Sequence, residues 1–206
     1  MRHSPGGTLR KRTFDLVVAA TALLLLLPIL LLIAVAILVD SGRPVLFRQT
    51  RIGRGGQRFR ILKFRTMVPD AESHSGNVSP HGDLRVTRIG RILRRWYLDE
   101  LPQFVNVVRG EMSLVGPRPE TPEFVELLGP DELRVLEVQP GVVGPSTLQF
   151  MDEARLLADA DDPEEYYRTT LLHERTRADL SYLELQGFGY DLRLLVRQVA
   201  LILRSA

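Results

Sequence analysis

An uncharged apolar run near the N-terminus constrains this chain more than any other feature. Residues 16–39 read LVVAATALLLLLPILLLIAVAILV, 24 positions without a charged side chain. As a straight helix with a rise of ~1.5 Å per residue the run is roughly 36 Å long, enough for a hydrocarbon core of about 30 Å. A cleaved signal peptide is the alternative, but its apolar region is usually only about 7–15 residues long. We therefore expect a retained membrane anchor over residues 1–40 and one domain over residues 41–206.

Pro28 lies in the middle of this run. Proline removes a backbone donor and clashes with the preceding turn, which predicts a kink in the helix. Basic residues flank the run on both sides, and such flanks favour the cytoplasmic face of a membrane. They are Arg2, Arg10, Lys11 and Arg12 before the run, and Arg43, Arg48, Arg51 and Arg54 after it. A re-entrant helix that bends at Pro28 and returns to the same face satisfies both flanks. A Pro-kinked spanning helix is the alternative, because membrane helices tolerate proline.

The composition limits the chemistry that is available. The chain has no cysteine, which excludes disulfides, a thiol nucleophile and thiolate metal sites. Its four histidines are scattered at positions 3, 74, 81 and 173, without the spacing of a metal-binding motif. Any catalysis must therefore use carboxylates, basic groups, hydroxyls or a hard metal ion.

The remainder of the chain is predicted to be predominantly α-helical with a small β-hairpin. Residues 45–53 and 57–67 alternate apolar and polar side chains on either side of Arg54-Gly55-Gly56, which predicts two paired strands. The polar segment 68–86 is typical of a long loop. Helical patterns cover 87–98, the segment between Pro102 and Gly110, and residues 131–138, 163–186 and 190–205.

Two of these helices are amphipathic and basic. Residues 87–98 place Ile89, Ile92, Leu93 and Trp96 on one side and four arginines on the rest of the surface. This pattern suits a membrane interface with anionic lipid, and equally an ordinary surface helix. Residues 190–205 either lie in the interface or close the core. The arginines share their segments with a membrane anchor and match no nucleic-acid-binding motif, so we expect no nucleic-acid partner.

Two adjacent carboxylates occur in the stretch LDELPQFVNV, residues 98–107. Asp99 and Glu100 would point about 100° apart on a helix, so they can share a pocket only where the backbone departs from a helix. Pro102 predicts such a departure at Leu101. Nearby cations or a divalent ion such as Mg²⁺ would relieve the repulsion between the two carboxylates. A carboxylate can also attack phosphorus. The ordinary alternative is that the pair caps a helix.

The chain resembles the bacterial sugar transferases of the monotopic phosphoglycosyltransferase superfamily. The similarity covers KRTFDLVVA (11–19), PVLFRQTRIG (44–53), FRILKFRTM (59–67), QPGVVG (139–144) and DLSYLELQGFGYDLRLLVRQV (179–199). Its longest block is RVTRIGRILRRWYLDELPQFVNVVRGEMSLVGPRPE at 85–120. The resemblance implies transfer of a sugar 1-phosphate from a nucleoside diphosphate sugar, usually UDP-linked, to polyprenyl phosphate of the undecaprenyl type. It also implies a membrane-lipid environment at the cytoplasmic face of a bacterial inner membrane.

The resemblance also implies roles for individual residues. Asp99 matches the nucleophile that forms a phosphosugar-aspartyl intermediate, and Glu100 matches its partner, expected to help hold Mg²⁺ or assist proton transfer. Pro28 matches the proline that breaks the family's re-entrant helix. Further matches are candidates for contacts with substrate phosphates: Lys63, Arg65, Arg94 and Arg118.

Three departures from the family pattern bear on these expectations. Leu27 stands before Pro28 where some members have a serine, and PSTLQF at 145–150 differs from the sequence of many members in a region expected to bear on sugar choice. From the resemblance we also expect a catalytic-core form, without the additional N-terminal membrane helices and the cofactor-like domain of long members. The resemblance does not specify the sugar, the polyprenol or the oligomeric state. A non-catalytic membrane-surface adaptor is the competing hypothesis, although an adaptor has no use for Asp99, Glu100, Arg94 and Arg118 together.

Overall fold

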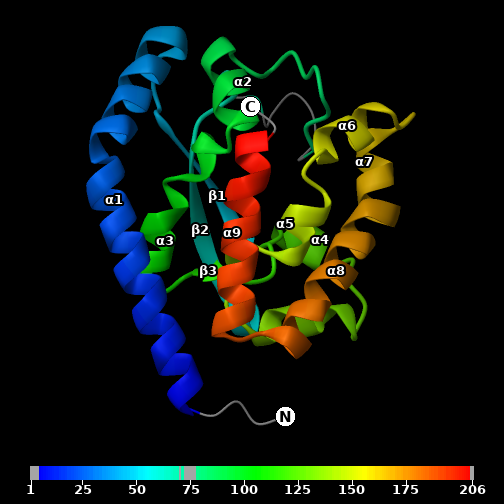
Figure 1. Ribbon diagram of the computed structural model, residues 1–206. Coiled ribbons are helices and arrows are strands. Elements are labelled where there is room, and N and C mark those ends of the chain that lie inside the picture. Colours follow the sequence, from blue (N-terminus) through cyan, green and yellow to red (C-terminus); the bar gives the residue numbers. More distant parts are fainter. Residues whose placement is uncertain (1–4, 70, 72–77, 205–206) are drawn as a thin grey trace.

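The structure is mostly helical, with two small sheets. This computed structural model describes residues 5–69, 71 and 78–204, so the predictions that concern His3 and His74 lie outside the described residues. The elements follow one another in Figure 1 as α1 (Pro5–Ser41), β1 (Leu46–Ile52), η1 (Arg54–Gly56), β2 (Arg58–Phe64), α2 (Arg88–Arg95), η3 (Leu98–Glu100), α3 (Gln103–Arg109), β3 (Ser113–Val115), α4 (Pro122–Val125), η4 (Glu132–Glu137), β4 (Gly141–Val143), α5 (Pro145–Gln149), α6 (Glu153–Ala158), α7 (Pro163–Tyr166), η5 (Tyr167–Leu171), α8 (Leu172–Leu185) and α9 (Phe188–Arg204).

The predicted β-hairpin is confirmed. Strands β1 and β2 pair antiparallel, with Leu46 opposite Phe64 and Ile52 opposite Arg58. The connection is a short 3-10 turn in which Gly55 and Gly56 both have positive φ, a conformation that glycine adopts at little cost. A second sheet was not predicted: β3 and β4 pair in parallel, and each is only three residues long. Strands this short carry too little alternation to be recognised from sequence.

The predicted helices are present, with boundaries that their ends explain. Thr87 caps α2, its Oγ1 accepting a hydrogen bond from the Gly90 amide. Gly110 ends α3 with a φ of 82°. The segment predicted to be helical at 163–186 consists of α7, a π-helical turn η5, and α8 in succession. The segment at 131–138 is the 3-10 helix η4.

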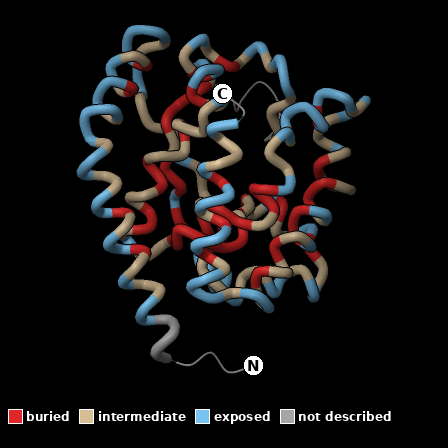
Figure 2. The backbone as a smooth tube through the Cα atoms, in the orientation of Figure 1, coloured by how far each residue is buried: buried red, intermediate tan, exposed pale blue. Residues whose placement is uncertain are grey.

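Helix α1 runs along one edge of the molecule, and the β1–β2 hairpin and α9 lie between it and helices α6 to α8 (Figure 1). It is assigned as one continuous helix through Pro28. The re-entrant path therefore stays a prediction. Residues 9–41 are long and apolar enough to cross a membrane, and only 6% of their most apolar 18-residue stretch is buried within the protein. Figure 2 shows the outer side of α1 as largely exposed.

Three groups of buried side chains hold the domain together. One joins the N-terminal half of α1 to α3, both short strands, α8 and α9, through residues such as Ala19, Val107 and Leu194. Another joins the C-terminal half of α1 to β2 and α2, through Ile33, Ile37, Phe64 and Leu93. The third lies under α4, α6 and the π-helical turn. The apolar helix thus packs against the domain through residues toward each of its two ends.

Candidate active site

The two adjacent carboxylates lie in a turn between α2 and α3, which we call the dyad turn (residues 97–101). Tyr97 has φ 55° and ψ 21°, the left-handed conformation, and Asp99 and Glu100 follow in the single 3-10 turn η3. The break from helical geometry is therefore at Tyr97. The prediction that Pro102 forces the break at Leu101 is wrong, because Leu101 has φ −53° and ψ −35°, within the right-handed helical region. The Tyr97 hydroxyl donates to the Met151 carbonyl at 3.0 Å, which helps to hold this rare conformation.

Asp99 and Glu100 have different surroundings. Glu100 Oε1 accepts hydrogen bonds from Lys63 Nζ at 2.7 Å and from Arg118 Nη2 at 3.0 Å. Asp99 is buried, with 9% of its surface exposed, and its carboxylate has no hydrogen bond or ion pair with any residue in the described part of the chain. Neither side chain caps α3, whose N-terminus at Pro102 has no side-chain cap. The helix-cap alternative is thus not supported.

The ionisation of the two carboxylates differs accordingly. Burial raises the pKa of Asp99, and Lys63 opposes this effect while Glu100 adds to it. Burial alone would also raise the pKa of Glu100, but Arg118 and Lys63 together hold it well below its usual range. Glu100 is therefore a fixed anion paired with two cations, whereas Asp99 is an unpaired group whose charge is costly to bury.

Lys63 and Arg94 reach the dyad turn from elements on either side of it. Lys63 stands near the end of β2, and burial lowers its pKa, an effect that Glu100 opposes. Arg94 is in the last turn of α2, where its Nε donates to Thr66 Oγ1 at 2.9 Å and its Nη1 to Ser79 Oγ at 2.7 Å. Burial lowers the pKa of Arg94, and Asp99 raises it, which places the guanidinium within the electrostatic reach of that carboxylate.

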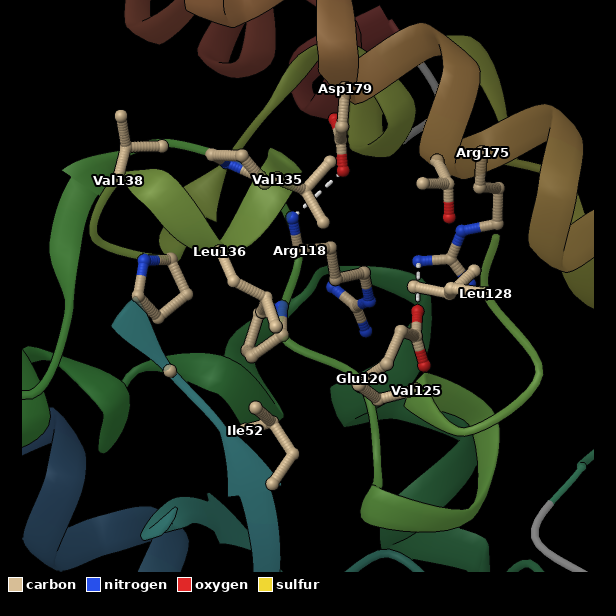
Figure 3. A pocket seen from close by; sticks show the side chains of 15 residues that line it. Ile52, Arg118, Glu120, Val125, Leu128, Val135, Leu136, Val138, Arg175 and Asp179 are labelled. Carbon is tan, nitrogen blue, oxygen red and sulfur yellow. Dashed lines mark hydrogen bonds and ion pairs between the residues drawn. The ribbon is translucent and has the colours of Figure 1, made fainter. Parts of the chain in front are cut away.

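Arg118 is presented by the rigid Pro117-Arg118-Pro119 turn. Its amide donates to Asp179 Oδ2 at 2.8 Å, drawn as a dashed line in Figure 3 beside a small cavity of about 20 Å³. Asp179 also accepts from the amide and the hydroxyl of Ser146, at 2.9 and 2.8 Å. Asp179 therefore joins three segments that are far apart in the sequence. It was not predicted as a site residue, and its only signal was the similarity of the segment that begins with it.

Arg65, predicted to contact substrate phosphates, donates its hydrogen bonds to backbone carbonyls at the end of α1. Its Nη2 donates to the Ser41 and Gly42 carbonyls at 2.8 and 2.7 Å, and its Nη1 donates to the Arg43 carbonyl at 2.9 Å. These carbonyls lie at the end of α1, where helical carbonyls lack partners within the helix. The side chain lines the cavity described below, but its hydrogen bonds give it a structural role, because they occupy both terminal nitrogens.

A cavity of about 1030 Å³ opens beside the dyad turn and includes both carboxylates in its lining. Eight cationic side chains face four carboxylates around it, and this excess favours an anionic ligand. No histidine of the described residues lines it. The cations are Arg48, Arg51, Lys63, Arg65, Arg85, Arg94, Arg118 and Arg175. The structure thus brings to one cavity Asp99, Glu100, Lys63, Arg65, Arg94 and Arg118. Their roles toward a substrate stay predictions.

A further wall of the cavity was missed by the sequence reasoning. Arg175, from α8, donates through Nη1 to Glu153 at 2.6 Å and to the Tyr167 hydroxyl at 3.2 Å. Its Nη2 forms an ion pair with Glu120 at 3.7 Å, also drawn in Figure 3. Tyr167 begins the π-helical turn, and such turns are frequent at functional sites. Arg175 and Tyr167 sit within an ordinary helical pattern, so spacing alone gave no reason to select them.

The two carboxylates were also predicted to hold Mg²⁺. Among the described residues there is no group of three or more acidic or histidine side chains that could enclose a metal ion. Magnesium, however, is often held by one or two carboxylates together with substrate phosphates. The unpaired carboxylate of Asp99, beside Glu100 in a cavity suited to anions, is compatible with that arrangement and not with a site built from protein ligands alone.

Comparisons with known proteins agree with this geometry. A family model described as bacterial sugar transferase matches residues 7–205. The chain is 39% identical to a UDP-glucose:undecaprenyl-phosphate glucose-1-phosphate transferase of Caulobacter vibrioides, over 98% of this chain and 75% of that protein. It is 41% identical to a UDP-N-acetylgalactosamine-undecaprenyl-phosphate N-acetylgalactosaminephosphotransferase of Aeromonas hydrophila, over 77% of this chain and 37% of that protein. It is also 41% identical to an exopolysaccharide production protein of Rhizobium meliloti, over 68% of this chain and 69% of that protein.

Proposed function

The chain belongs to the bacterial sugar transferase family, and from this premise we propose that it transfers a sugar 1-phosphate from a UDP-sugar to undecaprenyl phosphate. This reaction places the first sugar of an exopolysaccharide or glycoconjugate on its lipid carrier. The two relatives whose names specify a sugar use different ones, glucose and N-acetylgalactosamine, so the proposal extends to the reaction and not to one sugar.

The observation that carries the proposal is the contrast between the two carboxylates. Asp99 is buried beside a large cationic cavity with no hydrogen-bond or ion-pair partner in the described part of the chain, while Glu100 next to it is held by Lys63 and Arg118. A carboxylate without partners in a site of excess positive charge can attack an electrophile such as phosphorus. An adaptor would gain nothing from keeping such a group buried, because a buried unpaired charge reduces stability.

The proposed reaction has two displacements at the same phosphorus atom. An Asp99 carboxylate oxygen attacks the sugar-bearing phosphorus, forming an acyl-phosphate as the bond to the nucleoside monophosphate breaks. A phosphate oxygen of undecaprenyl phosphate then attacks that phosphorus, forming the diphosphate and releasing the Asp99 carboxylate. Arg118, Arg94 and Lys63 provide positive charge next to the phosphoryl oxygens in both steps. Tyr97 holds the dyad turn so that Asp99 faces the cavity.

We include Mg²⁺ as the implied cofactor, with Asp99 and Glu100 as its protein ligands. When bound, the ion would neutralise charge on the diphosphate and improve the nucleoside monophosphate as a leaving group. The protein would contribute the carboxylates of Asp99 and Glu100 as ligands. Of these, Glu100 Oε1 already accepts hydrogen bonds from two cations, Lys63 and Arg118.

We also propose that the molecule lies on one membrane face. Asp15 near one end of the apolar segment accepts a hydrogen bond from Ser113, and Ile37 near the other end packs with Phe64 and Leu93. These two positions are ~33 Å apart along the helix, about the thickness of the hydrocarbon core. A spanning α1 would draw the arginine-rich α2 to membrane depth, which is unfavourable. A re-entrant or surface-lying α1 avoids this cost and supports the predicted cytoplasmic location of the domain.

The exposed face of α9 supports the same placement. Phe188, Leu192, Val196, Val199 and Leu203 form an apolar stripe along it, with exposed fractions between 45% and 69%. Arginines at positions 193, 197 and 204 border the stripe, and such a helix is suited to an interface with anionic lipid. Phe14 of α1 contacts Phe188 edge to face, at 5.2 Å between ring centroids, so the apolar surfaces of the two helices meet.

The proposal is tested with membranes containing the full chain, undecaprenyl phosphate, Mg²⁺ and a panel of UDP-sugars. We expect release of UMP with one or a few of the sugars, and its loss in Asp99→Asn. With the donor alone, mass spectrometry of the wild type should detect a phosphosugar adduct on the peptide containing Asp99. The exposed Asp131→Asn serves as the control and should behave as the wild type. Full activity of Asp99→Asn would exclude the covalent route, and no UMP release by the wild type with any sugar would favour the adaptor.

A further inference from the structure

We propose that α1 is a positioning element for the reaction as well as a membrane anchor, because it holds the outer ends of the two helices that flank the dyad turn. Arg12 holds the C-terminus of α3, and Asp40 holds the N-terminus of α2. This inference rests on the proposed function for its kinetic consequence. Its structural content, that α1 fixes the dyad turn, stands on contacts alone.

The contact at α3 is made by the Arg12 guanidinium. Its Nη1 donates to the Val107 carbonyl at 2.6 Å and its Nη2 to the Val108 carbonyl at 2.8 Å. These carbonyls are in the last turn of α3, where helical acceptors are short of intrahelical donors and the helix dipole favours a cation, although the Val107 carbonyl also accepts the Gly110 amide at 3.0 Å. Gly110, the residue that ends α3, leaves room for this side chain: a Cβ there would lie 3.3 Å from Arg12 Nη2.

The contact at α2 has the opposite sign. Asp40 Oδ2 accepts a hydrogen bond from the Ile89 amide at 3.2 Å, in the first turn of α2. First-turn amides lack intrahelical acceptors and attract an anion. Thr87 satisfies the neighbouring Gly90 amide, so Asp40 and Thr87 together complete the start of this helix. Each end of α1 therefore carries the charge that the helix end opposite it requires.

Between these two contacts, two apolar clusters join α1 to the domain, one toward each end of the helix. Ile33 and Ile37 pack with Leu93 of α2, and Leu98 and Leu101 of the dyad turn lie against the same cluster. At the other end, Ala19 packs in a cluster with Val107 of α3, and Phe104 and Val108 lie against it. Helix α1 thus follows the whole path from α2 through the dyad turn to α3.

The dyad turn needs such support because its own elements are short. Helix α2 has eight residues and α3 has seven, and isolated helices below about 12–15 residues are marginal in water. Arg65 fastens the far end of α1 by binding the carbonyls of residues 41–43. Displacement of α1 would therefore release both supports of the turn that carries Asp99 and Glu100. The sequence analysis counted Arg12 among the basic residues that flank the apolar run and predict its topology. In the structure, however, its guanidinium binds two carbonyls of the protein.

The test compares Arg12→Ala with Arg10→Ala in the full chain, reconstituted in anionic lipid nanodiscs. Arg10 is exposed, lies on the same helix and has no ion pair or hydrogen bond within the described residues, so its removal matches the loss of charge. Hydrogen–deuterium exchange of residues 98–109 should accelerate in Arg12→Ala and not in Arg10→Ala. With UDP-glucose or UDP-N-acetylgalactosamine, whichever the wild type consumes, kcat for UMP release should fall about tenfold in Arg12→Ala, while KM stays within about twofold. Arg12→Lys, which can still donate to one carbonyl, should recover part of the loss.

The outcomes separate this inference from the proposed function. Unchanged exchange in Arg12→Ala, or equal acceleration in Arg10→Ala, would overturn it. If the wild type releases no UMP, the proposed function fails while the exchange measurement still decides the inference. Should Arg12→Ala fail to accumulate, Asp40→Ala tests the opposite end with the same two measurements. Asp40→Asn keeps an acceptor for the Ile89 amide and should then lie between Asp40→Ala and the wild type.

Discussion

At the scale of single residues, the site depends on keeping one carboxylate occupied and its neighbour free. Lys63 and Arg118 occupy Glu100 at 2.7 and 3.0 Å. They also supply positive charge close to Asp99, so the same two cations stabilise the fixed anion and favour ionisation of the nucleophile without pairing with it. A direct ion pair between Asp99 and a cationic side chain of the protein would oppose the effect of burial on the Asp99 pKa more strongly. It would also make the carboxylate less available for attack.

The pH dependence of the first half-reaction follows from these groups. Asp99 attacks as a carboxylate and its pKa is raised by burial, so kcat/KM for the UDP-sugar should rise along an acid limb that lies above pH 3.8, the ordinary aspartate value. Burial lowers the pKa of Lys63, so the rate should fall along an alkaline limb below pH 10.5. Glu100, with its strongly lowered pKa, stays ionised throughout. UMP release measured against pH checks both limbs. Lys63→Arg, whose charge does not titrate in this range, should remove the alkaline limb and leave the acid limb in place; an unchanged alkaline limb would contradict the assignment to Lys63.

The sequence was sufficient to predict that Asp99, Glu100, Lys63, Arg94 and Arg118 converge, because their motifs lie in one long block of similarity and its neighbours. It was insufficient to predict the hydrogen-bond partners of Arg65, which follows the end of β2, two residues after Lys63. Both side chains line the cavity. Which partner each one takes depends on what the tertiary structure places opposite, and for Arg65 that is the end of α1.

At the scale of elements, the helix ends decide how the site is built. The turn that brings two neighbouring carboxylates together was predicted correctly as a departure from helix, but its cause was assigned to Pro102 instead of Tyr97. A tyrosine in the left-handed conformation has no local sequence signal, because it is held by a contact with Met151 more than fifty residues away. The predicted end of α3 at Gly110 is correct because glycine readily adopts the left-handed conformation that ends a helix, a preference that is visible in the local sequence.

The role assigned to Arg65 at the end of α1 gives a prediction at this scale. Arg65→Ala should lower the free energy of unfolding by about 3 kcal/mol, because buried carbonyls lose charged donors, and should leave KM for the UDP-sugar nearly unchanged. Thermal unfolding in nanodiscs and initial rates of UMP release measure the two effects. Arg58→Ala, an exposed position at the start of β2, the strand that ends just before Arg65, is the matched control and should change neither. A rise in KM of about tenfold with unchanged stability would restore Arg65 to the phosphate site.

At the scale of the whole molecule, the apolar run correctly predicted one long N-terminal helix, and the domain was correctly predicted to be mostly helical with one hairpin. The sequence could not show that this helix is also part of the domain. Its contacts reach from Lys11 to Asp40 and involve α2, α3, β3 and α9. They depend on side chains far away in the sequence, so the predicted boundary at residue 40 marks a change of composition more than a separation of structure.

The proposed placement on one membrane face predicts that α9 contacts lipid. The chain has no cysteine, so a single one can be introduced at Val199 of α9 and labelled with an environment-sensitive fluorophore. In anionic vesicles this label should shift to the blue and be quenched by lipids that carry a quencher in the acyl chain. Leu156→Cys, exposed on α6, a helix on the side of α9 away from α1, should show neither change (Figure 1). Equal responses at both positions, or none at position 199, would contradict this placement.

The three hydrogen bonds of Asp179 determine when, during synthesis of the chain, the site becomes complete. The Arg118 amide is bound by the carboxylate of Asp179, 61 positions later in the chain. Ser146 also binds Asp179, and both Ser146 and Arg118 line the cavity beside the dyad turn. The turn that presents Arg118 cannot be complete until α8 has left the ribosome and docked. The apolar helix α1 precedes all of these segments in the chain, so it can reach a membrane while the reaction centre is still incomplete.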